Sequence, residues 1–144
     1  MMKPRQIALA KILTYSGTLP LIASVLLTQF PFSGADARGI AMAYGAVIIS
    51  FLCGIHWAIY LFFAQKCPSN LLITSNAVAL LAWGSLLIVH QPTAILLQSL
   101  CFIYLLTLDL KLRDASILPQ WFYCLRRNAT IIVVLCLSAV KVLA

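Results

Sequence analysis

The residue best suited to chemistry in this sequence is a histidine set deep in an apolar run. His56 lies in the run 39–63, which contains no Lys, Arg, Asp or Glu. Ionisable side chains in such a run are costly and usually face the protein interior. His56 is therefore expected either to take up a proton or touch a ligand in an inward-facing pocket, or to fix helix registry as a neutral imidazole bonded to a neighbour.

Polar side chains on the other apolar runs are expected at a similar depth. Asp109 is placed nearer the rim of such a pocket, and the alternative is that it ends its helix or pairs with Lys111 or Arg113. The predicted polar pocket consists of Tyr15, His56, Asn76, Tyr104 and Asp109. In the registry interpretation, His56 bonds to Tyr15, Asn76 or Tyr104.

A second feature of the run 39–63 is a stripe of small residues. They recur every four positions: Ala46, Ser50, Gly54 and Ala58. This small-xxx-small spacing lets two helix backbones approach closely in lipid. The stripe is expected to be a helix-packing surface on a helix that is central to a bundle, with His56 on the opposite face.

The composition requires these residues to be positioned by membrane-spanning helices. The chain has 144 residues, of which 63% are hydrophobic and only 9% are charged, far below the share of charged residues in a soluble domain. We predict a single all-α domain over 1–144, a polytopic bundle of five transmembrane helices. Their expected ranges are 7–30, 39–63, 71–89, 93–109 and 128–144.

The first of these helices carries Pro20, which removes one backbone donor and should kink the helix. A carbonyl near Ser16 then needs another donor, from a neighbour, a hydroxyl or water. The alternative for this region is a cleavable signal peptide, because Ala35-Asp36-Ala37 has the small-residue form of a cleavage site. We favour an uncleaved helix, since the apolar run is long for a signal.

The mixed segment 110–127 is predicted to lie along the headgroups. Its expected interfacial anchors are Trp121, Tyr123, Arg126 and Arg127, because aromatic and basic residues gather at this depth. The alternative is that these four side chains bind a quinone or a lipid headgroup.

The basic residues set the expected orientation. With a cytoplasmic N-terminus, the inner side holds Lys3, Arg5, Lys11, Lys66, Lys111, Arg113, Arg126 and Arg127. The outer side then holds Arg38 and Lys141. This bias predicts that the N-terminus is inside and the C-terminus is outside.

Several classes of function are disfavoured. The net charge of +7 forms no basic stripe on a soluble face, so nucleic acid is not an expected partner. The five cysteines have no metal-binding spacing and form no disulfide framework. The two histidines belong to opposite leaflets, which argues against a haem held between them. We expect no catalytic residues, no metal and no cofactor, because no catalytic motif is present.

A resemblance covers nearly the whole chain. Its motifs, in order, are Tyr15-x-Gly17-x-x-Pro20, Tyr44-Gly45-Ala46, Ser50-Phe51-Leu52, Gly54-x-His56-Trp57, Leu81-Ala82-Trp83 and Pro119-x-Trp121 with Leu125-Arg126 and Thr130. The chain resembles a family of small membrane proteins catalogued as domain of unknown function 3429, which includes transmembrane protein 69. It departs from the family pattern at Cys53, Ala58 and Ala77, where the family usually has Gly, Gly and Pro. The resemblance implies a bacterial inner-membrane or mitochondrial-type protein and no established activity.

These observations predict a non-enzymatic, multi-pass protein of the bacterial inner membrane. Its expected role is a structural or assembly accessory of another membrane complex. The expected partners are the lipid bilayer and another membrane protein or a second copy of the chain. The alternative is a small-molecule or proton pathway through an inward-facing polar pocket around His56. In this alternative His56, Asn76, Tyr15 and Tyr104 line the pocket, and Asp109 and Arg126 cap it.

Overall fold

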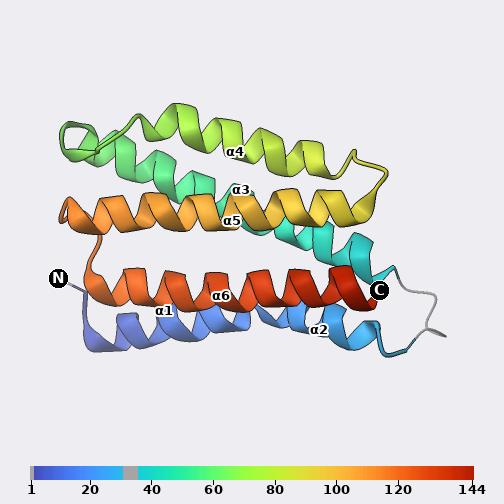
Figure 1. The fold of residues 1–144 in the computed structure, drawn as a ribbon. Coiled ribbons are helices and arrows are strands. Elements are labelled where there is room, and N and C mark those ends of the chain that lie inside the picture. The colour runs from blue at the N-terminus through green and yellow to red at the C-terminus, as the bar shows by residue number, and fades with distance from the viewer. Residues whose placement is uncertain (1, 31–35) are drawn as a thin grey trace.

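The computed structural model describes residues 2–30 and 36–144, and every regular element within them is helical. The helices are α1 (Pro4–Ser16), α2 (Leu19–Leu27), α3 (Ala37–Phe63), α4 (Leu71–Ser85), α5 (Gln91–Asp114) and α6 (Gln120–Leu143), with a short 3₁₀ turn, η2 (Ala64–Lys66), after α3. The helices lie side by side, and α1 begins at the end of the bundle opposite the C-terminus (Figure 1). The predicted all-helical class is confirmed.

Four helical stretches are long and apolar enough to cross a membrane: Pro4–Leu27, Ala37–Lys66, Gln91–Asp114 and Gln120–Leu143. The remaining helix, α4, has 15 residues, or about 22 Å at 1.5 Å per residue. Leu86, Leu87 and Ile88 extend it in a tighter coil, because each donates its N–H to a carbonyl three residues earlier. The apolar helical path therefore runs from Leu71 to Ile88.

The helices start where polar side chains or prolines satisfy or remove free backbone donors. Asp36 caps α3 by accepting from the Gly39 N–H at 2.9 Å. Asn70 caps α4 by accepting from the N–H groups of Leu72 and Ile73. Pro92 and Pro20 stand in the first turns of α5 and α2, where a missing N–H costs nothing.

The first membrane-length stretch is interrupted, as Pro20 predicts. α1 ends at Ser16 and α2 begins at Leu19. The freed carbonyl of Gly17 accepts a hydrogen bond from the Tyr44 hydroxyl of α3 at 2.8 Å. Thus a hydroxyl from a neighbouring helix supplies the donor that the sequence required near Ser16. The Ala35 part of the possible cleavage site lies outside the described residues.

The segment 110–127 is not a separate surface segment, which corrects the expected helix limits. α5 continues to Asp114, and α6 already begins at Gln120. Leu108 and Leu112 are buried, so the core-facing side of α5 continues past Asp109. The exposed Lys111 and Asp114 lie on the other side of the same helix and do not end it. The chain turns at Ser116, whose φ of 59° is left-handed, and Ile117 donates back to Leu112 O at 3.0 Å.

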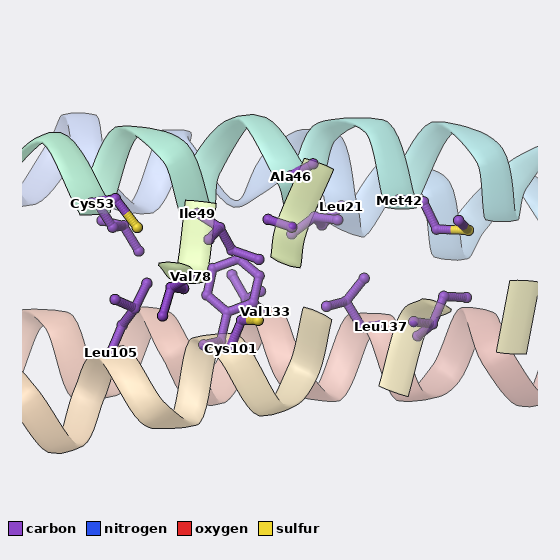
Figure 2. Packing of buried hydrophobic residues seen from close by; sticks show 14 of the residues in the cluster. Leu21, Met42, Ala46, Ile49, Cys53, Val78, Cys101, Leu105, Val133 and Leu137 are labelled. Atoms are coloured by element: carbon purple, nitrogen blue, oxygen red, sulfur yellow. The ribbon is translucent and has the colours of Figure 1, made fainter. Parts of the chain in front are cut away.

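The core runs along α3, which packs against α2, α4, α5 and α6. Met42, Ala46, Ile49 and Cys53 follow one side of α3 and face Cys101 and Leu105 of α5 and Val133 and Leu137 of α6 (Figure 2). Their spacing of four, three and four residues is that of a helix seam. Val78 and Leu21 close the same cluster from α4 and α2.

Candidate functional site

A buried ionic network joins three helices. Asp109 of α5 lies between His56 of α3 and Arg126 of α6: its Oδ1 is 2.8 Å from His56 Nε2, and its Oδ2 accepts from Arg126 Nε at 3.0 Å. The exposed fractions are 1% for His56, 2% for Asp109 and 8% for Arg126. We call these three residues the ionic network.

Each member stands on the core-facing seam of its helix. His56 follows Cys53 by three residues and so continues the α3 seam. Asp109 lies between the buried Leu105 and Leu112 of α5. Arg126 precedes Thr130 and Val133 on the buried side of α6. The three polar side chains meet because helical periodicity places them where the neighbouring positions are apolar core.

The contacts assign roles to the polar atoms. Arg126 donates to Asp109 from Nε, and an ionised Asp109 accepts through both oxygens. His56 Nε2 contacts Asp109, and its other ring nitrogen, Nδ1, is buried without a hydrogen-bond partner among the described residues. The arrangement can hold three helices in register, and it leaves one ring nitrogen of His56 without a partner.

Of the five predicted pocket residues, the structure brings together only His56 and Asp109. Tyr104 is 42% exposed and Tyr15 is 39% exposed, and Asn76 is also exposed. Tyr15 instead makes a long contact of 3.4 Å from its hydroxyl to Asn128 Nδ2. Asp109 neither ends its helix nor pairs with Lys111 or Arg113, because Arg113 bonds to Asp114 at 2.8 Å.

The predicted interfacial anchors divide into buried and exposed residues. Tyr123 and Arg126 are each 8% exposed, Trp121 is half-buried and Arg127 is exposed. The Arg113 guanidinium lies over the Tyr123 ring, with its central carbon 4.6 Å from the ring centroid. Arg126 therefore differs from the surface role expected of it, since its side chain turns inward to Asp109.

The small-residue stripe is largely unused inside the chain. Ala46 is buried, but Ser50, Gly54 and Ala58 are exposed. A Cβ placed on Gly54 would meet no atom within 4 Å among the described residues. A close approach of α3 to another helix occurs instead at Gly45, where a Cβ would overlap the side-chain oxygen of Gln98.

Gln98 is the centre of a second buried polar cluster, which we call the amide cluster. Its Nε2 donates to the Met42 carbonyl at 2.9 Å and to Ser85 Oγ at 2.8 Å. Gln98 and Ser85 are both 0% exposed. Since Ser85 Oγ donates in turn to Ala82 O, the cluster ties α5 to α3 and α4 without any charge.

An apolar cavity of about 310 Å³ lies beside the ionic network. Residues of α1, α3, α5 and α6 line it, among them Leu13, Phe51, Phe102 and Val133. Among the described lining residues, Arg126 is the only charged one, and His56 is not part of the wall. The cavity therefore reaches the ionic network through the arginine.

Sequence reasoning placed Arg126 beside Asp109 only in the pathway alternative, as a second cap of the pocket, and it missed the role of Gln98. The available signal was spacing: Arg126, Thr130, Val133, Leu137 and Val140 recur every three or four residues, as helix-seam positions do. Gln98 stands on the same side of α5 as Asp109, three helical turns away. The expected start of the last helix at Asn128 left Arg126 outside its seam.

No group of three or more His, Cys, Asp or Glu side chains that could hold a metal ion occurs in the described part of the chain. Among known families, the one described as "Protein of unknown function (DUF3429)" matches residues 7–142. No curated protein and no solved structure matches the chain. The resemblance found in the sequence motifs is thus confirmed as a family relationship.

Proposed function

Because the chain belongs to the DUF3429 family, whose function is unknown, we propose a role from its geometry: a non-enzymatic structural or assembly accessory of another membrane complex. Its four apolar helices of membrane length are those of a membrane protein. The proposal further takes α4 with its extension to Ile88 as a fifth span, and places the protein in the bacterial inner membrane.

Charge supports a cytoplasmic N-terminus. The start of α1, the α3–α4 connection and the α5–α6 connection lie at one end of the bundle (Figure 1). Eight of the ten basic residues lie toward this end, whereas Arg38 and Lys141 lie at the other. The positive-inside rule assigns the basic end to the cytoplasm.

The observation that carries the accessory role is the uncovered small face of α3. Ser50, Gly54 and Ala58 are exposed, and the space beside Gly54 is open among the described residues, although such spacing is the usual means of close helix association in lipid. The ionic network and the amide cluster, in contrast, connect the chain's own helices. The free surface rather than the interior is therefore the region suited to a partner.

Site-specific photo-crosslinking in the native membrane tests this role. A crosslinker at Gly54 is expected to capture one defined partner, another membrane protein or a second copy of the chain, and Ser50→Leu should abolish that product. Ser138→Leu, the same change at an exposed position of α6, is the matched control. Absence of a specific product at Gly54, or equal loss with Ser138→Leu, would contradict the proposal.

The unpartnered Nδ1 of His56 favours a second candidate, a proton or small-molecule pathway through the inner half of the protein. Its requirement is water at His56. A cysteine at position 56 should then react with an aqueous thiol reagent from the cytoplasmic side, at a rate close to that of a surface cysteine at Gln65. No reaction at position 56 would remove this candidate.

A further inference from the structure

Arg126 has hydrogen-bond donors that the protein does not use. Its Nε donates to Asp109, whereas no described residue accepts from its two terminal amino groups. Arg126 lies six residues into α6, or about 9 Å from the start of the helix. In a membrane interior each such donor needs an acceptor, because no bulk water is present to supply one.

The cavity beside Arg126 is where an acceptor can enter. Apart from the guanidinium, its wall is apolar except for Gly17 and the threonines Thr14, Thr18 and Thr130. The Thr14 hydroxyl donates to Ala10 O within α1, and the Thr18 hydroxyl, between α1 and α2, donates to Tyr15 O. A volume of about 310 Å³ lies at the lower end of the range of ligand sites. A suitable occupant is therefore mostly hydrocarbon with one polar group.

The cavity opens to the side of the bundle that meets lipid. Two of its lining residues are strongly exposed, Leu13 of α1 at 63% and Phe51 of α3 at 65%. No residue of α1 is fully buried, so this wall covers the cavity only partly. An occupant therefore enters from the hydrocarbon of the bilayer rather than from the aqueous phase.

The charge around the cavity selects the sign of the polar group. Lys11 directly follows the lining residue Ala10, and Arg127 directly follows Arg126. Two of the three acidic residues, Asp109 and Asp114, lie toward the same end of the bundle as eight basic residues, so this end carries a net positive charge. Basic pockets between helices on the cytoplasmic side attract anionic lipid headgroups.

We propose that this cavity is a binding site for an anionic phospholipid of the bilayer. One acyl chain occupies the apolar cavity between α1, α3 and α6, and the phosphate accepts hydrogen bonds from the terminal amino groups of Arg126. Asp109 holds the guanidinium from its Nε side and so aims the remaining donors at the cavity. The ionic network is then a positioning device for a lipid as well as a connection between helices.

Native mass spectrometry of the purified chain tests the site, with phosphatidylglycerol and phosphatidylcholine of identical acyl chains as probes. Both lipids offer the phosphate to Arg126, but phosphatidylcholine also brings a choline cation, which the basic end of the bundle repels. The wild type is therefore expected to retain phosphatidylglycerol about tenfold better. The pair Asp109→Asn with Arg126→Gln, which keeps the network neutral, should abolish the preference. Arg127→Gln, which removes a charge beside the cavity wall, is the matched control and should retain most of it.

A filling variant keeps the test valid if the double variant does not fold. Ala10→Phe narrows the cavity without changing any charge and should reduce retention of both lipids, whereas Ala77→Phe on the exposed side of α4 should not. Equal retention of the two lipids by the wild type would overturn the proposal. So would a loss of preference in Arg127→Gln as large as in the double variant, or unchanged binding in Ala10→Phe.

Discussion

The chain contains two buried polar clusters that connect helices by different means. The ionic network joins α3, α5 and α6 through a carboxylate, an imidazole and a guanidinium. The amide cluster joins α3, α4 and α5 through a side-chain amide, a hydroxyl and a backbone carbonyl. Asp109 and Gln98 lie on the same side of α5, about 16 Å apart along its axis.

The difference between the clusters lies in what each leaves unsatisfied. Gln98 uses both donors of its amide on the protein, but its side-chain oxygen is buried without a partner among the described residues, and no lining residue of the apolar cavity belongs to the amide cluster. The ionic network retains unused donors on Arg126 and adjoins that cavity. The neutral cluster thus leaves an acceptor enclosed in the core, whereas the charged one presents a cation to a ligand.

The largest effect is expected from breaking the ionic network at one member. Arg126→Gln leaves the Asp109 carboxylate buried without its cation, which should cost about 3–5 kcal/mol of unfolding free energy. Adding Asp109→Asn should restore much of that loss, because no unpaired charge then remains. Unfolding in mixed micelles of the two single variants and the double variant measures the coupling. Additive losses would show that the two residues stabilise the fold independently.

An intermediate effect is expected from crowding the amide cluster. Gly45→Ala places a methyl group against the Gln98 oxygen. To make room, the amide must give up its hydrogen bond to Met42 O or to Ser85, which should lower the unfolding free energy by about 1–3 kcal/mol. Gly54→Ala on the same helix is the matched control and should cause no loss, because the space beside it is open. Thermal unfolding in detergent compares the two, and equal behaviour would place Gly45 outside any close contact.

The smallest effect is expected where a polar contact is only partly buried. Tyr44→Phe removes the hydroxyl that donates to Gly17 O at the α1–α2 break and should cost about 1 kcal/mol. Tyr60→Phe on α3 is the control, since the Tyr60 hydroxyl makes no hydrogen bond with any described residue. The same unfolding measurement applies. If Tyr44→Phe lowered the unfolding free energy as much as Arg126→Gln, the charge of the ionic network would not explain the larger cost of breaking it.

Parts of the site were predictable from sequence because their cause is local. The break near Pro20 follows from its missing N–H, which leaves the Ser16 carbonyl without its helical donor, and Tyr44 donates to the adjacent Gly17 carbonyl. The depth of His56 follows from its place in an uncharged run. That Asp109 bonds directly to Arg126 within the core did not follow, because the sequence does not show that the charged residues after Asp109 belong to two helix ends.

The apolar runs and the basic residues near their ends determined, without any structure, that this is an all-helical chain of membrane type. Only the tertiary structure decided how each helix is rotated. In a membrane protein the lipid-facing and core-facing sides are both apolar, so hydrophobic periodicity does not mark the inside. Rotation is what sends Gly54 to the surface, turns Arg126 inward to Asp109, and places its unused donors at the wall of a cavity.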